Sequence, residues 1–327
     1  MGSKVRNISV IIPTKNRPND LNLLIELLGE QTILPKEVIV VDDSTDSKTK
    51  EIVNRYIKRF ESLGVEVKHV RGNGEGIALA RNIGFSYSTG EICLFLDDDI
   101  IINRRYIEEI LKIYERFPNA IGVSGYILNF FPEFSTLRNA ITKVFFGVYG
   151  TPDKCQARPL GMSYPYRLEK VINCEWLSGT NSSYRREILK IFKWDKKLKR
   201  YSLCEDKDLS YRIHKRFPNS LFITPHAKVI HKASPTGRLS DKNVIYLGTM
   251  YSTYIYFKNW KQTFRNLLTF ILGMFFGYLM LRILTSNPKL VIYQIGAYFH
   301  LLKNFEKVKN GNLDFLEKIM LADKKFA

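Results

Sequence analysis

The sequence lacks the features that would place it in a secreted or disulfide-stabilised class. Its four cysteines, Cys93, Cys155, Cys174 and Cys204, are scattered and show no paired spacing of metal ligands. No signal-peptide pattern opens the chain, because the first apolar run, ISVII, stops at Pro13 and suits a strand better. Internal repeats and low-complexity tracts are not apparent. We therefore expect reduced thiols in a cytosolic setting.

Acidic residues are missing from a long C-terminal stretch. No Asp or Glu occurs between Asp241 and Glu306, whereas seven Lys or Arg residues and many aromatics do. Its apolar runs, NLLTFILGMFFGYLML and LVIYQIGAYFHLL, fall short of the roughly 20 residues of a spanning helix. They predict interfacial helices or a re-entrant hairpin, with a buried helical subdomain as the alternative. We expect residues 239–327 to hold the protein on the cytoplasmic side of the cell membrane, as a peripheral or monotopic protein.

The overall charge predicts an anionic partner. The 327 residues include 50 Lys or Arg against 32 Asp or Glu, a net charge of +18. Nucleic acid, a phosphorylated substrate or an anionic membrane face would each suit that balance. Yet the stretch EICLFLDDDI places Asp97, Asp98 and Asp99 side by side. Adjacent carboxylates repel one another unless a cation or hydrogen-bond donors offset the repulsion, so the cluster indicates a metal and phosphate site more than a solvated strand end.

Strands alternate with helices over the first 128 residues. We predict strands over 8–12, 37–45, 65–72, 91–100 and 120–128, and helices over 17–31, 48–64, 74–90 and 103–118. Asn19 or Asp20 is the expected N-cap of the first helix. Residues 127–172 are loop-rich and aromatic, which is typical of a substrate-facing region. The alternation predicts an α/β fold with a doubly wound, mostly parallel sheet.

This fold predicts where the acidic residues gather. Ligands of open parallel sheets bind beyond the carboxyl ends of the strands. Residues 13–16, 42–43 and 97–99 each follow such an end, so we expect them to converge on one crevice.

Six segments in order resemble glycosyltransferase family 2 over residues 7–235. They are SVIIPTKNRP, VIVVDDST, GIALARNIG, FLDDDI, WLSGTNSSYRRE and CEDKDLSYRI. The resemblance implies a GT-A fold over residues 1–238, with a nucleotide-binding half of about 1–125 and an acceptor half of about 126–238. It also implies sugar transfer from a nucleotide-diphosphate donor with inversion. Ser44 departs from the usual Gly of the acidic turn, and residues 127–172 match no family segment.

The leaving diphosphate requires a metal, for which Mn²⁺ or Mg²⁺ with oxygen ligands is suited. On an extended chain Asp97 and Asp99 point the same way and Asp98 the opposite way. We assign Asp99 to the metal, and Asp97 or Asp98 to the ribose or the metal. Family resemblance implies His231 as a further metal ligand, although a structural role is the alternative.

The nucleotide-sugar site is also assigned by resemblance. Asp43 would accept a hydrogen bond from the nucleotide base, with Pro13, Thr14 and Asn16 lining the same pocket. Arg81 is the cation expected to face this site, with an exposed helix arginine as the alternative. Gly179 would let the backbone approach the donor sugar closely.

Inversion needs a base that takes the proton of the attacking acceptor hydroxyl. The resemblance assigns this role to Asp206, and helix capping is the alternative. Glu205 would orient the acceptor, while Asp208 would cap the helix or support the local fold.

We therefore predict a metal-dependent, hexosyltransferase-like enzyme of polysaccharide or glycolipid biosynthesis. Its partners would be a nucleotide-sugar donor, a saccharide or lipid-linked acceptor and an anionic membrane surface, without nucleic acid. One alternative is a sugar-1-phosphate nucleotidyltransferase, which would want a Gly-rich loop in place of PTKNRP. A non-catalytic basic module that binds membrane or nucleic acid is the other, and it leaves the acidic strand ends unexplained.

Overall fold

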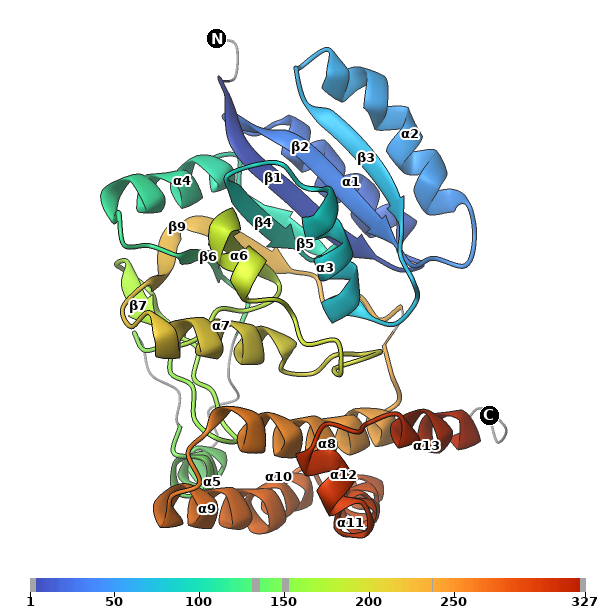
Figure 1. Ribbon diagram of the computed structural model, residues 1–327, viewed down its shortest axis with the longest axis vertical. Helices are drawn as coiled ribbons and strands as arrows, with labels where there is room; N and C mark the ends of the chain where they lie inside the picture. Colours follow the sequence, from blue (N-terminus) through green and yellow to red (C-terminus); the bar gives the residue numbers. More distant parts are fainter. Residues whose placement is uncertain (1–3, 131–135, 149–152, 237, 324–327) are drawn as a thin grey trace.

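The computed structural model describes residues 4–130, 136–148, 153–236 and 238–323, and its centre is a nine-stranded sheet (Figure 1). The strands are β1 (Lys4–Thr14), β2 (Ile33–Asp42), β3 (Glu66–Arg71), β4 (Ile92–Leu96), β5 (Ile100–Ile102), β6 (Gly122–Ile127), β7 (Ile172–Cys174), β8 (Asn181–Arg185) and β9 (Leu221–His231). Their order is β3-β2-β1-β4-β8-β6-β9-β5, and β7 pairs with β9. The α/β class predicted from the alternation is confirmed.

The first half of the sheet is parallel and carries the predicted helices. β1 pairs in parallel with β2 and β4, and β2 with β3. The connecting helices are α1 (Pro18–Gly29), α2 (Lys48–Glu61), α3 (Ile77–Tyr87) and α4 (Tyr106–Arg116). Helix α3 lies close to the sheet because Gly84 has no side chain: a Cβ there would stand 2.3 Å from Cγ2 of Ile11.

The second half is mixed, which the sequence pattern did not predict. β8 runs antiparallel between β4 and β6, and β5 and β7 both run antiparallel to β9. Among the described strands of this half, β6 and β9 alone pair in parallel. These strands are short and pair across long sequence separations, so a local pattern does not determine their direction.

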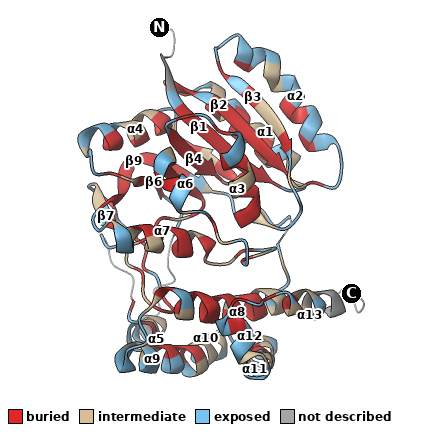
Figure 2. Ribbon diagram, in the orientation of Figure 1, coloured by how far each residue is buried: buried red, intermediate tan, exposed pale blue. Residues whose placement is uncertain are grey.

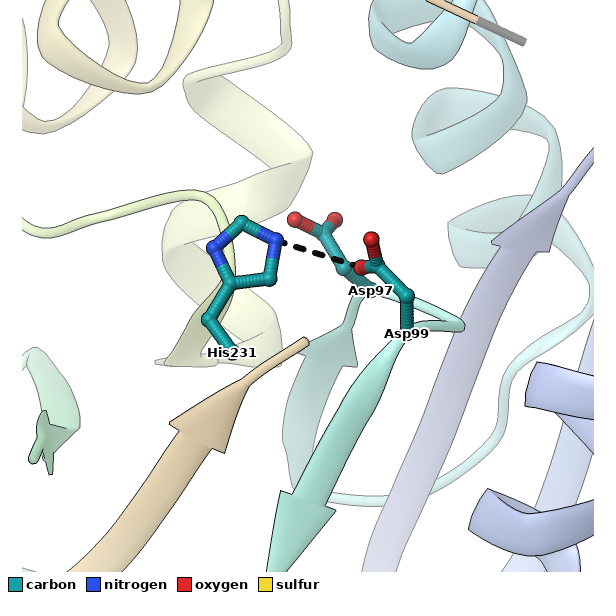
Figure 3. A group of neighbouring side chains, drawn as sticks. All are labelled: Asp97, Asp99 and His231. Carbon is teal, nitrogen blue, oxygen red and sulfur yellow. Dashed lines mark ion pairs between the residues drawn. The ribbon is translucent and has the colours of Figure 1, made fainter. Parts of the chain in front are cut away.

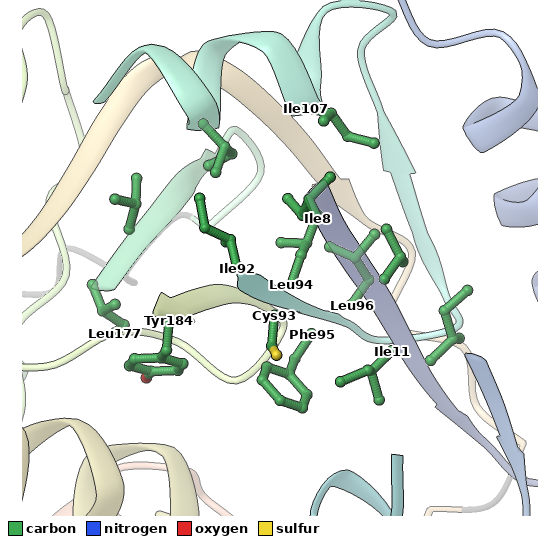
Figure 4. Packing of buried hydrophobic residues seen from close by; sticks show 14 of the residues in the cluster. Ile8, Ile11, Ile92, Cys93, Leu94, Phe95, Leu96, Ile107, Leu177 and Tyr184 are labelled. Atoms are coloured by element: carbon green, nitrogen blue, oxygen red, sulfur yellow. The ribbon is translucent and has the colours of Figure 1, made fainter. Parts of the chain in front are cut away.

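Strand β4 is buried on both faces, as expected of a central strand. Figure 4 shows Leu94 and Leu96 on the side of Ile107, and Cys93 and Phe95 on the other side. All five residues of β4 are buried. Their burial fixes the strand, and so it fixes where the acidic triplet that follows must begin.

The remaining helices form a second layer with its own core (Figure 1). They are α5 (Thr136–Phe146), α8 (Asp241–Asn259), α9 (Phe264–Ile271), the π-helical segment η1 (Leu272–Gly277), α10 (Tyr278–Ile283), α11 (Pro288–Lys303), α12 (Phe305–Lys309) and α13 (Phe315–Asp323). Two further helices, α6 (Arg186–Ile191) and α7 (Glu205–Arg216), stay with the sheet. Helix α5 lies in the predicted loop-rich region, yet its residues Ile141 and Phe146 join the core of the C-terminal helices.

Two local expectations were wrong. Helix α1 begins at Pro18 with Arg17 as its N-cap, so Asn19 and Asp20 lie inside the first turn. The fixed φ of proline suits the first helical position, and this explains the earlier start. In addition, α9, η1 and α10 make one continuous helix, Phe264–Ile283, that is long and apolar enough to cross a membrane by length and composition. The apolar run counted in the sequence lay between Arg265 and Arg282, whereas the helix includes both arginines.

Candidate active site

A cavity of about 450 Å³ opens at the carboxyl ends of the parallel strands. Eleven of the twelve site residues predicted from the sequence line it: Pro13, Thr14, Asp43, Arg81, Asp97, Asp98, Asp99, Gly179, Glu205, Asp206 and His231. The convergence expected from strand ends therefore occurs for residues 13–15, 43 and 97–99. Asp42 is the exception, because its carboxylate lies 2.9 Å from Nε2 of His69 and does not line the cavity. The volume is in the range of small-molecule sites, which run from about 300 to 1,000 Å³.

Asn16 is the residue that does not line the cavity. It adopts a left-handed conformation with φ 54°, and its Oδ1 accepts a hydrogen bond from the Thr45 backbone N–H at 2.9 Å. Its own N–H donates to Oγ of Ser44 at 2.8 Å. Asn16 thus connects the loops after β1 and β2 by hydrogen bonds. Ser44, which stands in place of the usual Gly, makes one of these hydrogen bonds.

The acidic triplet divides as the extended chain predicts. Asp98 turns toward the β1 loop, where its carboxylate accepts from Oγ1 of Thr14 at 2.7 Å and from Arg17 at 3.0 Å. Burial outweighs these partners and raises the pKa of Asp98 to about 7. Asp97 and Asp99 lie beside His231 (Figure 3), and Nη1 of Arg17, which contacts Asp98, also lies 3.2 Å from Oδ2 of Asp99.

Asp97, Asp99 and His231 together form a candidate metal centre. One potential ligand atom from each lies within 4.8 Å of the other two, and Nε2 of His231 is 3.2 Å from Oδ1 of Asp99 (Figure 3). Sheet pairing sets this approach, because β5 runs antiparallel to β9 with Ile100 opposite His231. Burial works against ionisation of Asp99, but the hydrogen bond to His231 prevails and lowers its pKa. The same hydrogen bond raises the pKa of His231.

Arg81 is buried at the centre of the site, so the exposed-arginine alternative is wrong. Its guanidinium lies 3.0 Å from Oδ1 of Asp97, 2.6 Å from Oε1 of Glu205 and 2.9 Å from the carbonyl O of Gly179. A Cβ at Gly179 would stand 2.9 Å from Nη2 of Arg81, so glycine permits this approach. Burial, reinforced by the nearby charge of Asp206, raises the pKa of Glu205 to about 8 despite the arginine.

Asp206 occupies the first turn of α7 and faces the cavity. Its Oδ2 accepts from the Gly179 backbone N–H at 2.9 Å, and Oδ1 accepts from the Lys207 backbone N–H at 2.7 Å. The loop that contacts Arg81 through its carbonyl therefore also orients Asp206 through its N–H. Each carboxylate oxygen keeps room for a further hydrogen bond.

Asp208, two residues further along α7, is fully buried and does not line the cavity. It binds Arg212 at 3.0 Å, Lys258 at 2.9 Å and Nδ2 of Asn259 at 2.8 Å. Because Lys258 and Asn259 end helix α8, Asp208 fastens that helix to α7. This agrees with the structural role predicted for it.

Arg17, Arg200 and Glu317 are among the cavity residues that sequence reasoning did not assign to the site. Arg17 binds Asp98 and Asp99, and its Nε donates to the Thr236 carbonyl at 2.8 Å. Arg200 and Glu317, 3.3 Å apart, close the cavity from the side of α13. Arg17 lay within the quoted motif SVIIPTKNRP and was detectable there. No pattern connects Glu317 to a site more than two hundred residues earlier in the chain.

Comparison with known structures identifies the fold. A mannosyltransferase from Pyrobaculum calidifontis, solved in complex with GDP-Man and Mn²⁺, aligns with a TM-score of 0.55 and 17% identity. The alignment covers 91% of this chain and 75% of the other. The chain therefore has the GT-A fold of glycosyltransferases.

The family follows from the sequence itself. The model of glycosyl transferase family 2 matches residues 9–192, which is more than half of the chain, and the protein belongs to that family. The resemblance drawn from the six motifs is thus confirmed.

Curated relatives match over limited lengths. An uncharacterised glycosyltransferase of Haemophilus influenzae is 35% identical over 113 residues, which is 34% of this chain and 36% of that relative. A glucosyl-dolichyl phosphate glucuronosyltransferase of Haloferax volcanii is 24% identical over 240 residues, 69% of each chain. The match thus spans little more than a third of the first relative's length.

Proposed function

We propose that the protein is an inverting, metal-dependent glycosyltransferase that moves a hexose from a nucleotide-diphosphate sugar to a hydroxyl of a saccharide or lipid-linked acceptor. The observation that carries the proposal is that a candidate metal site and a candidate catalytic base face the same cavity. Asp97, Asp99 and His231 gather on one side, and Asp206 faces the same space from the start of α7. Gly179 and Arg81 connect the two sides.

The donor set supports a divalent cation. Two carboxylates and one imidazole supply oxygen and nitrogen ligands of the kind that Mn²⁺ accepts, and Mg²⁺ is suited to the carboxylates. Bound there, the metal would neutralise the charge that develops on the leaving diphosphate. Arg81 holds Asp97 in place for this role from a fully buried position, so it is a positioning residue.

The chain's own residues account for the remaining chemistry. The acceptor oxygen forms a bond to the anomeric carbon while the bond from that carbon to the diphosphate oxygen breaks. The nucleoside diphosphate leaves with the electron pair, and the acceptor proton passes to Asp206. Attack from the side opposite the leaving group inverts the anomeric configuration. Asp43, whose Oδ1 accepts a hydrogen bond from the Gly74 N–H at 2.8 Å, lines the same cavity and would recognise the nucleotide base.

The acceptor class is inferred from relatives and from the cavity. The Haloferax volcanii relative is named for a dolichyl phosphate-linked acceptor, and its match covers 69% of this chain, against 34% for the Haemophilus influenzae relative. In this protein the cavity is also lined by Asn243 of α8 and Glu317 of α13. The C-terminal helices therefore supply part of the cavity wall, and an acceptor attached to a lipid would approach along them.

A donor panel tests the proposal. Purified protein is incubated with UDP- and GDP-linked hexoses, with Mn²⁺ or with EDTA, and release of the nucleoside diphosphate is measured. We expect hydrolysis of one donor class that EDTA abolishes, and NMR of an early product should show the inverted anomer. Retention of configuration, or turnover unaffected by EDTA, would contradict the proposal.

A further inference from the structure

The layer of helices furthest from the sheet has an apolar face that the described residues leave uncovered. Of the 23 large hydrophobic side chains exposed in the described part of the chain, 13 lie between Phe264 and Leu302. Among these, Ile292, Phe299 and Leu302 are each 64% to 67% exposed. Figure 2 shows exposed residues along α9, α10 and α11, while α8, drawn above them in this view, is mostly buried. A soluble core helix would hide such side chains.

These side chains are arranged by helical spacing. Along α11, the exposed residues Ile292, Ile295, Phe299 and Leu302 recur every three or four positions. The same stretch of α11 turns Gln294, Ala297 and Leu301 inward, where they are buried. The helix is thus amphipathic with two faces: one packs on the protein and the other is apolar and exposed.

The charges around this face have one sign. Lys261, Arg265, Lys289 and Lys303 are exposed, and no carboxylate occurs between positions 242 and 305. A second copy of this face would bring cation against cation, which disfavours a symmetric protein interface. An anionic lipid surface offers both the apolar interior and the complementary charge.

We propose that α9, η1, α10 and α11 form a lipid-docking face that lies in the plane of an anionic membrane. Gly273 and Gly277 favour a helix that lies in the membrane plane over one that spans the membrane, because α5 crosses the helix at these glycines at close range. A Cβ on Gly273 would stand 2.6 Å from the Phe145 carbonyl O. Only 22% of the apolar window of Phe264–Ile283 is buried, so most of this helix lies outside the core although Phe270 and Met274 belong to it.

Docking in this orientation sets the distance of the cavity from the lipid. Helix α8 packs against α11 and against α7, and its residue Asn243 lines the cavity. One packed helix layer is about 10 Å thick, so the cavity stands about that far above the docking helices. A saccharide attached to a lipid head group fits that reach. This last step rests on the proposed function, whereas the docking face does not.

Vesicle co-sedimentation of the full chain tests the docking face. Vesicles of equal parts phosphatidylcholine and phosphatidylglycerol are compared with pure phosphatidylcholine, at low and high salt. We expect the protein to sediment with the anionic vesicles at low salt. High salt should release it only partly, because the charge contribution is screened and the apolar insertion is not.

Two sets of variants separate the contributions. Phe276→Glu, Ile292→Glu and Phe299→Glu combined should reduce partitioning about tenfold or more on either vesicle. Lys289→Glu with Lys303→Glu should cost about fivefold per residue on anionic vesicles alone. Ile191→Glu, on a residue 72% exposed on α6, is the matched control and should sediment like the wild type. Thermal unfolding of each variant monitors the fold.

Three results would overturn the inference. The first is that the full-length protein stays in the supernatant at low salt. The second is that the triple variant sediments with the vesicles as the wild type does. The third is that ultracentrifugation shows a dimer of the wild type and a monomer of the triple variant. The last would make the face a contact between copies. None of these outcomes depends on turnover, so they are distinguishable from failure of the proposed reaction.

Discussion

The cavity and the C-terminal helices differ in the sign of the charged side chains that they gather. The cavity is lined by seven carboxylates, those of Asp43, Asp97 to Asp99, Glu205, Asp206 and Glu317, and the buried guanidinium of Arg81 pairs with Asp97 and Glu205. Residues 242–305 hold no carboxylate and expose cations beside apolar side chains. The net charge of +18 therefore describes neither region. Function follows from the local sign of the charge, which the average over the chain conceals.

Helix α7 is where the two regions meet. Asp206 and Asp208 are two positions apart, which places them on opposite sides of a helix with 3.6 residues per turn. Asp206 faces the cavity, while Asp208 binds Lys258 and Asn259 at the end of α8. The same residue type in one turn thus has two different tasks, and substitutions at the two positions should separate them.

The largest expected effect is on turnover. Asp206→Asn should lower the rate of transfer about a hundredfold or more, because base catalysis typically contributes that much. Binding of UDP or GDP with Mn²⁺, measured by calorimetry, should survive because the metal side is untouched. Near-normal transfer by this variant would remove Asp206 from the role of base.

The metal side should respond differently. Asp99→Ala should abolish the Mn²⁺ dependence of nucleotide binding, a loss exceeding the roughly 10- to 100-fold cost of changes around a metal ligand. His231→Ala should weaken that dependence. Calorimetric titration of Mn²⁺ in the presence of the nucleotide measures both. If His231→Ala binds Mn²⁺ as tightly as the wild type, the histidine only orients Asp99.

Asp208→Asn is the counterpart of Asp206→Asn and should act on stability. The substitution removes the charge that three donors share in a fully buried position, so we expect a loss of about 2 kcal/mol in the free energy of unfolding. Urea unfolding measures it, with Asp206→Asn as the control of equal chemistry. Equal stability of the two variants would mean that Asp208 does not fasten α8.

The sequence predicted the parallel half of the fold, and eleven of its twelve predicted site residues line the cavity, because both depend on local patterns. Apolar runs mark buried strands, and polar residues directly after them must lie at one sheet edge. The rest depends on distant pairings. β8 enters between β4 and β6, and Glu317 reaches Arg200 from the last helix. No pattern within one segment reports where another segment will pack.

The smallest effect concerns Lys207, which lies at the boundary of the two regions. Its Nζ is 4.9 Å from the centroid of the Trp260 ring and donates to the Pro159 carbonyl at 3.2 Å. Burial lowers the pKa of Lys207 to about 8, whereas the unfolded chain keeps a value of about 10.4. Between these values the unfolded state holds a proton that the folded state has lost, so this residue makes stability rise with pH from about 8 to about 10.4.

Lys207→Met should therefore change both the size and the pH dependence of stability. At pH 7 the buried charge costs folding free energy, and methionine removes it while keeping a contact with the aromatic ring. The lost cation–π contact and hydrogen bond offset part of the gain, so we expect the variant to be more stable by about 1 kcal/mol. Urea unfolding from pH 7 to 10.5 should show a flatter profile than the wild type. Lys190→Met, at an exposed position of α6, should leave that profile unchanged. A variant less stable than the wild type at pH 7 would show that the ammonium group stabilises this boundary, and that the cation joins the two regions as Lys258 does.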